Sequence, residues 1–75
     1  MEELIYIQLL KEGVEVYRPV SAYKLKDNVY KIQGRDIYDP DNEQWEFLPD
    51  TYVYVENRTL SEGDVLVAIK KYDEV

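Results

Sequence analysis

The sequence predicts an all-β domain, a small barrel of five or six antiparallel strands, and three observations favour it. Apolar and polar residues alternate with period two over most of the chain. Turn-forming residues interrupt this alternation at roughly ten-residue intervals, which is typical of small β-barrels. No eleven-residue window shows the recurrence of an amphipathic helix. The 75 residues form a single domain, 1–75, and a two-sheet sandwich usually needs about 100.

The N-terminal segment predicts two strands joined by a hairpin loop. In LIYIQLL the side chains of Ile5, Ile7 and Leu9 face inward. The loop KEG follows, and Gly13 supplies the positive φ of a tight turn. The second strand, 14–20, places Val14, Val16 and Val20 on the inner face. Pro19 cannot donate a ladder hydrogen bond, so this strand lies at an edge or bends there.

The remaining chain contains five further β segments. AYKL and VYKI flank the hairpin signal KDN, with Ala22, Leu25, Tyr30 and Ile32 inward. WEF places Trp45 and Phe47 on one face, and TYVYV alternates cleanly. The last strand runs over 65–71, with Val65, Val67 and Ile69 inward. The predicted core consists of Ile5, Ile7, Val14, Val16, Tyr30, Ile32, Phe47, Val53, Val67 and Ile69.

The composition excludes several classes of function. The chain has no cysteine and no histidine, so it lacks a disulfide framework, a thiolate zinc site and the commonest general base. Neither Ser21 nor Ser61 has a histidine to activate it. We therefore expect no enzyme, no catalytic residues and no cofactor. Nothing resembles a secretory signal or a membrane span, and we expect a cytoplasmic protein.

The charge is acidic overall and unevenly distributed. The net charge of −7 disfavours binding to nucleic acid or to an anionic membrane. Residues 18–35 nevertheless hold five bases and one acid, whereas residues 36–57 hold seven acids and no base. Either the two halves pair across neighbouring strands, or the protein presents two faces of opposite sign.

The acidic loop 39–46 contains Asp39, Asp41, Glu43 and Glu46. A calcium loop of the EF-hand type needs glycine at its sixth position and glutamate at its twelfth. Counted from Asp39, these positions hold Gln44 and Asp50. The segment DPDN is instead typical of a solvated turn, so we expect no metal site.

Four tyrosines carry the best candidate site. If the apolar residues beside them face inward, then Tyr6, Tyr17, Tyr52 and Tyr54 face outward. Together they can form an aromatic patch that binds a protein or stacks on bases. Alternatively, they form cross-strand pairs that only shield the sheet.

Arg18 lies at an inward position between Val16 and Val20. A guanidinium there needs a partner, and the acid-rich second half offers several carboxylates. Its role is either a structural ion pair or the anchoring of a ligand.

The segment LSEGDVLVAIKK, in which Gly63-Asp64 precedes alternating valines, resembles the turn and strand of Src-homology-3-like barrels. Such domains bind proline-rich ligands through Tyr, Trp and Pro residues. Tyr38, Trp45, Pro49 and Tyr52 supply these types but in a different order along the chain. The resemblance implies the small-barrel architecture and not the ligand.

The combination of EGVEVYRPVSA, YKI, EQWEFLP and RTLSEGDVLVA resembles a family of short uncharacterised bacterial proteins. The resemblance spans residues 5–69 and implies no activity, because no function is assigned to that family. The family pattern has a Pro-Gly turn after the tryptophan motif, whereas this chain has Leu48-Pro49-Asp50.

We therefore expect a small interaction module that binds a protein partner, or itself, through an outer tyrosine face with Arg18. A nucleic-acid-associated role is one alternative, favoured by the basic segment and opposed by the net charge. An acidic inhibitor that occupies a basic site on another protein through residues 36–57 is the other.

Overall fold

The computed structural model describes residues 2–73, which form six strands and no helix. The strands are β1 (Glu2–Leu10), β2 (Tyr17–Lys26), β3 (Val29–Ile32), β4 (Gln44–Trp45), β5 (Tyr52–Leu60) and β6 (Gly63–Lys71). The all-β prediction is therefore confirmed.

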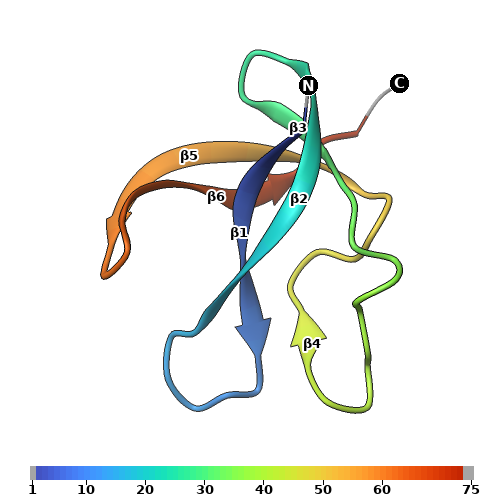
Figure 1. Cartoon of the computed structure of the whole chain (residues 1–75), viewed down its shortest axis with the longest axis vertical. Helices are drawn as coiled ribbons and strands as arrows, with labels where there is room; N and C mark the ends of the chain where they lie inside the picture. The colour runs from blue at the N-terminus through green and yellow to red at the C-terminus, as the bar shows by residue number, and fades with distance from the viewer. Residues whose placement is uncertain (1, 74–75) are drawn as a thin grey trace.

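Five of the strands close into a ring, so that the fold is a small barrel (Figure 1). Hydrogen bonds join β1 to β2, β2 to β3, β3 to β5, β5 to β6 and β6 back to β1, while β4 pairs only with the end of β1. Every consecutive pair is antiparallel, as predicted. The pair that closes the ring, β1 and β6, is parallel. In a ring of five strands that reverse direction in turn, the first and the last run the same way.

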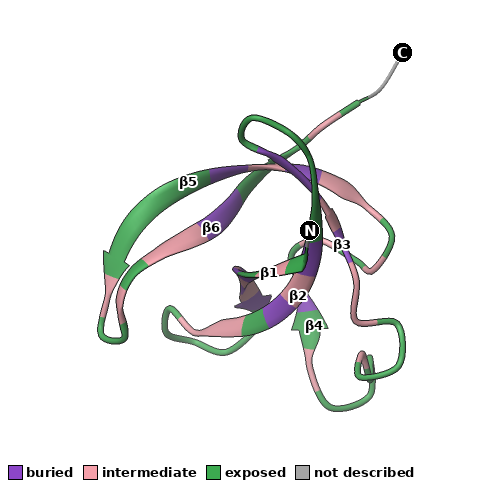
Figure 2. Cartoon of the chain, turned by 45° about the horizontal axis from the view of Figure 1, so that its top comes forward, coloured by how far each residue is buried: buried purple, intermediate pink, exposed green. Residues whose placement is uncertain are grey.

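The core lies inside this ring and contains five of the ten predicted residues, namely Ile5, Ile7, Tyr30, Ile32 and Val53. Figure 2 shows the buried residues in the middle of the long strands and an exposed end on the β5–β6 hairpin. Val16 and Phe47 are half-buried and pack against the core. The buried cluster consists of Ile5, Ile7, Leu9, Val20, Ala22, Tyr30, Ile32, Trp45, Val53, Val55 and Ala68.

Trp45 is the largest buried side chain and fixes the position of the chain around Gly34. Gly34 has φ +98°, and a Cβ atom there would lie 3.0 Å from Cη2 of Trp45 and 3.0 Å from Cγ1 of Val20. Only glycine combines this backbone conformation with so close an approach. The indole is anchored at its other end, where Nε1 donates to Glu43 Oε1 at 2.9 Å.

The loop between β1 and β2 corrects one core prediction. Lys11 and Gly13 both have positive φ, 64° and 77°, so the predicted turn at Gly13 is confirmed. The loop continues to residue 16, however, and β2 begins only at Tyr17. Val14 therefore belongs to the loop and is 72% exposed, so its assignment to the core is wrong.

Strand β2 is one continuous strand in place of the two segments predicted. Pro19 pairs with Tyr6 of β1, and the pairing of β2 with β3 begins only at Ala22. Pro19 thus lies where the second edge of the strand is unpaired, as its missing N–H requires. The register shifts between Lys24 and Lys26, and the extra residue, Leu25, is 45% exposed. The inward assignment of Leu25 is wrong, because alternation from the buried Ala22 places it on the outer side of the strand, where it is the unpaired residue of the bulge.

The alternation of β6 is also shifted from the predicted phase. Leu66 and Ala68 pack in or against the core, whereas Val67 is buried on the other side of the sheet, opposite Glu56 and beside Tyr6. The register against β5 shifts between Tyr54 and Val55, and Ile69 is left unpaired and 39% exposed. The core assignment of Ile69 is therefore wrong, because alternation from the inward Leu66 and Ala68 places it on the outer side of β6.

The turn after the tryptophan keeps its shape although glycine is absent. Asp50 has φ +70°, and Thr51 N–H donates to the carbonyl of Leu48 at 3.3 Å. Pro49 at the second position and a positive φ at the third are the features of a type II turn. Asp50 thus takes the left-handed conformation that glycine usually supplies at the third position of such a turn.

Candidate interaction surface

The tyrosines of β5 lie on the outer side of the barrel. Val53 and Val55 are buried inside the ring, so Tyr52 and Tyr54 between them face outward and are half-buried. The cross-strand neighbours of Tyr52 and Tyr54 on β3 are Lys31 and Val29. On the other side, Tyr54 lies opposite Lys70 of β6.

Lysine ammonium groups cover the rings of this surface. Within residues 2–73, three lysine–ring pairs occur. Nζ of Lys31 lies 5.9 Å from the ring centre of Tyr52, Nζ of Lys70 lies 5.4 Å from that of Tyr54, and Nζ of Lys26 lies 4.7 Å from that of Tyr72. The rings of Tyr54 and Tyr72 meet edge to face, with centroids 5.3 Å apart. We call these six residues the Lys–Tyr face. Cation–π contacts at such distances are worth about 0.5–1 kcal/mol each at exposed sites.

Tyr72 and the three lysines are the members of this face that sequence reasoning did not assign to a site. Tyr72 follows the last strand, so the alternation rule did not reach it. A usable signal exists in the two segments YKLKDNVYK and IKKY, where lysine and tyrosine alternate closely. Such interleaving indicates cation–π pairs once the strands are placed side by side.

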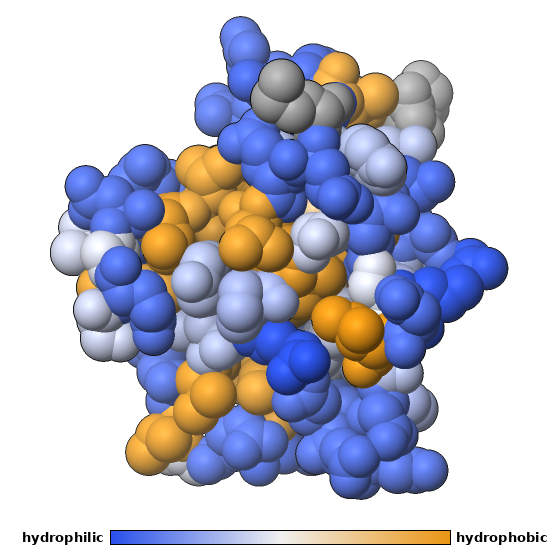
Figure 3. Space-filling view, in the orientation of Figure 1, coloured by the Kyte–Doolittle hydropathy of each residue, from blue (hydrophilic) through white to orange (hydrophobic). Residues whose placement is uncertain are grey.

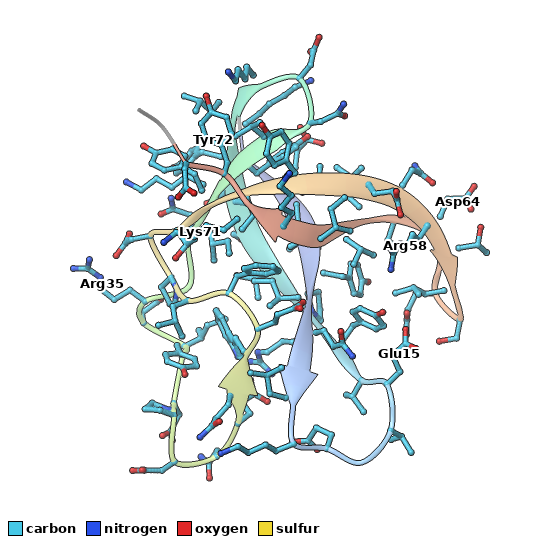
Figure 4. The ribbon with its side chains drawn as sticks, turned by 180° about the vertical axis from the view of Figure 1, so that it is seen from behind. Glu15, Arg35, Arg58, Asp64, Lys71 and Tyr72 are labelled. Atoms are coloured by element: carbon cyan, nitrogen blue, oxygen red, sulfur yellow. The ribbon has the colours of Figure 1, made fainter. Side chains whose placement is uncertain are left out.

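Tyr17 lies elsewhere on the molecule. Its hydroxyl donates to Oε1 of Glu15, and Arg58 of β5 is close enough to influence it. The hydrogen bond to Glu15, with a contribution from burial, raises the pKa of Tyr17. Figure 4 shows Glu15 and Arg58 on one side of the molecule and Lys71 and Tyr72 on the other. Tyr17 therefore lies beside the β1–β2 loop and is apart from the Lys–Tyr face.

Tyr6 lies on β1, beside the strands that flank it and not on the Lys–Tyr face. It is half-buried, lies opposite Pro19 of β2 and is the residue that pairs with Val67 across the parallel seam. Among the described residues, the ring contacts join Tyr54 to Tyr72 and Tyr38 to Trp45, and none joins two of the four predicted tyrosines. Tyr52 and Tyr54 thus lie on the Lys–Tyr face, while Tyr6 and Tyr17 lie beside other strands.

Arg18 pairs with a carboxylate of the acidic loop. It shares a face with Ile7 across the β1–β2 ladder, and its Nε atom lies 3.2 Å from Oε1 of Glu43. The Nε atom is buried and makes no hydrogen bond within residues 2–73, so the contact is ionic. The same Glu43 oxygen accepts the indole N–H of Trp45. Glu43 therefore joins the acidic loop to β2 and to the core.

The other carboxylates of this loop build a turn. Asp39 accepts the backbone N–H of Asp41 at 3.1 Å and the side-chain amide of Asn42 at 2.7 Å. The N–H groups of Asn42 and Glu43 both donate to the carbonyl of Asp39 at 3.0 Å. Among the described residues, no three Asp or Glu side chains are grouped as a metal site requires.

The apolar side chains left on the surface are dispersed. On the face drawn in Figure 3 they form separate patches divided by hydrophilic residues. Leu4, Leu10, Ile37 and Leu48 are examples, and they belong to β1 and to loops far apart along the chain. The exposed apolar side chains on this face therefore do not form one large apolar docking area. No helix within residues 2–73 has the length and apolarity to cross a membrane.

Comparison with known proteins yields no relative for this chain: no family model, no curated protein and no solved structure matches it. The geometry of the chain itself therefore carries any functional argument.

Proposed function

We propose that this protein is a small cytoplasmic interaction module that binds a protein partner, or a second copy of itself, through its tyrosines. The observation that carries the proposal is the group of three tyrosine rings on one outer surface, Tyr52, Tyr54 and Tyr72. Tyrosine is enriched in the centres of protein interfaces because it offers a large, stiff ring and a hydroxyl.

Tyr6, Tyr17 and Arg18 have a smaller part in this proposal. The ion pair of Arg18 with Glu43 and the hydrogen bond of Tyr17 with Glu15 give both residues a structural role. Tyr6 covers the seam between β1 and β6. We infer that the contact with a partner centres on the Lys–Tyr face and that these three residues support the fold behind it.

A nucleic-acid-associated role is the second candidate, and one observation favours it. Lys26, Lys31 and Lys70 alternate with tyrosine rings, and surfaces that bind single strands combine positive charge with rings on which bases stack. The net charge of −7 opposes this role. Binding to phosphates weakens steeply between low and moderate salt, whereas apolar contacts made by the tyrosine rings alone respond little.

The proposal is tested by affinity capture from a lysate of the native host with three forms of the protein. The first is the wild type, and the second carries Tyr52→Ser and Tyr54→Ser. The third carries Ile37→Ser and Leu48→Ser, which remove two exposed apolar side chains from loops outside the face. Each form is first shown to be folded by circular dichroism. We expect a protein that is retained by the wild type and the loop variant and is lost by the tyrosine variant.

Equal retention by all three forms would contradict the assignment of the tyrosine surface. Self-association is examined separately by sedimentation of the three forms over a range of concentrations. A dimer that forms with the wild type and not with the tyrosine variant identifies a second copy as the partner.

A further inference from the structure

The basic residues of the chain fall into two groups with different surroundings. All three arginines make ion pairs: Arg18 with Glu43, Arg35 with Asp50, and Arg58 with Glu56. Five of the six lysines belong to strands that border the Lys–Tyr face, and three of them lie over its rings. The five are Lys24, Lys26, Lys31, Lys70 and Lys71, and Nζ of Lys24 also lies 3.9 Å from Oδ1 of Asp27. Five of the nine basic residues are thus gathered at one end of the barrel.

The register of the strands places these lysines next to the tyrosine rings. One row crosses the barrel from Lys26 through Val29 and Tyr54 to Lys70, and the neighbouring row contains Tyr23, Lys31 and Tyr52. Adjacent strands lie about 4.8 Å apart, so the ammonium groups bracket the tyrosines. A ligand on this surface meets lysines at the sides and rings in the middle.

The lysines and the rings can exchange partners when a carboxylate approaches. An ammonium group over a tyrosine gains about 0.5–1 kcal/mol, and its long side chain is flexible. A carboxylate competes well for such an ammonium group, since charge-assisted hydrogen bonds are roughly twice as strong as neutral ones. As the lysine moves to the carboxylate, the face of the ring becomes open to an apolar or aromatic side chain.

The negative charge of the remaining surface limits how long an acidic ligand of the Lys–Tyr face can be. Apart from those five lysines, the chain holds sixteen acidic residues and four basic ones. A polynucleotide that crosses the Lys–Tyr face continues onto this acidic surface and is repelled there. A short acidic peptide segment ends where the lysines end. The charge distribution therefore favours a few carboxylates over a long phosphate backbone.

We propose that the Lys–Tyr face binds a short acidic segment of a protein partner. Its carboxylates pair with Lys26, Lys31 and Lys70, and its apolar or aromatic side chains lie on Tyr52 and Tyr54. The proposal rests on the proposed function, because it uses the same tyrosines, and it adds the chemistry of the partner.

The test uses three fluorescent probes titrated with the whole protein at low salt. The first is a synthetic peptide of six glutamates and two tyrosines, and the second carries glutamine in place of each glutamate. The third is an eight-nucleotide oligothymidylate. We expect the glutamate peptide to bind at least ten-fold tighter than either of the other probes, and its affinity to fall at least ten-fold in 0.5 M salt.

Two variants with the same net charge locate the binding. The first carries Lys26→Gln, Lys31→Gln and Lys70→Gln, and the second carries Lys11→Gln, Arg35→Gln and Arg58→Gln, which lie outside the face. Both lose three positive charges. We expect the first variant to lose at least ten-fold in affinity for the glutamate peptide and the second to stay within about three-fold of the wild type.

Each other outcome overturns the inference in a recognisable way. If the glutamate and glutamine peptides bind equally well, and both lose affinity for the variant with Tyr52→Ser and Tyr54→Ser, then the partner need not be acidic. The proposed function then still stands. Tighter binding of the oligothymidylate assigns the face to nucleic acid. Equal losses in the two charge variants show a general effect of net charge, and the absence of binding by any probe removes the acidic segment as the ligand.

Discussion

Asp50 shows how one residue can keep a turn that glycine would make with less strain. Its φ of +70° lies in the left-handed region, which costs a residue with a Cβ atom roughly 1–2 kcal/mol, and somewhat less for Asp or Asn. The carboxylate of Asp50 also accepts Nε of Arg35 at 3.0 Å, a contact on an exposed part of the surface that adds little stability. The backbone strain is therefore the larger of the two effects.

We expect Asp50→Gly to raise the free energy of unfolding by about 0.5–1 kcal/mol, because the strain is relieved. Asp50→Ala, which keeps a Cβ atom but loses the polar side chain, should lower it by about 1 kcal/mol. Urea denaturation of the two variants and the wild type gives the order. If Asp50→Gly is less stable than the wild type, then the ion pair with Arg35 outweighs the strain.

Because of Tyr30, the free energy of unfolding of the protein depends on pH in the alkaline range. It is 3% exposed, and its hydroxyl donates to Oε2 of Glu3 at 2.9 Å. Burial raises the pKa of Tyr30, and the hydrogen bond and the charge of Glu3 raise it further. The fold therefore favours the protonated phenol. This contribution is complete below the unfolded pKa of about 10 and is lost as the pH rises through the folded pKa.

We expect Tyr30→Phe to be less stable than the wild type at pH 8 by about 1–2 kcal/mol, since the hydrogen bond is lost. Between pH 9 and pH 11.5 the variant should lose less stability than the wild type, because it has no phenol to ionise at this position. Urea denaturation at the two pH values measures the difference. Equal losses in both proteins would contradict the burial of the Tyr30 hydroxyl.

The phase of the alternation decides which apolar residues of the long strands are inside, and the two bulges leave one residue of β2 and one of β6 unpaired. Strands without an interruption follow the pattern read from the sequence: Ile5, Ile7 and Leu9 of β1 and Val53 and Val55 of β5 are all buried. Leu25 and Ile69 are each the extra residue at a register shift, and both are exposed. A bulge depends on how two strands meet, and period two in one strand carries no signal of it.

Substitutions in β6 test this placement. We expect Ile69→Lys to change the free energy of unfolding by less than about 0.5 kcal/mol, because the side chain already faces solvent. Ala68→Lys should destabilise the protein by about 3 kcal/mol or more, since it places a charge and a long side chain in the filled core. Thermal unfolding followed by circular dichroism compares the two variants. The opposite order would restore the phase predicted from the sequence.

At the scale of the whole molecule, the sequence predicted the closed architecture better than the site. Turn residues and alternation define five hairpin-forming strands, and a short chain has few ways to bury them other than a barrel. The partner of Arg18 could be narrowed to the acid-rich half, but its identity as Glu43 depends on how the long loop after β3 folds back. The Lys–Tyr face combines residues of β2, β3, β5 and β6 with Tyr72, which follows β6, and only the strand order brings these together.

The parallel seam between β1 and β6 has a consequence for how the barrel assembles. Its one register pair joins Tyr6 to Val67, residues from opposite ends of the chain. Hairpins such as β5–β6 close a short loop, whereas the seam requires almost the whole chain to be ordered first. We expect the hairpins to form early in folding and the seam to close last. The seam would then set how fast the native barrel opens, while the hairpins set how fast it forms.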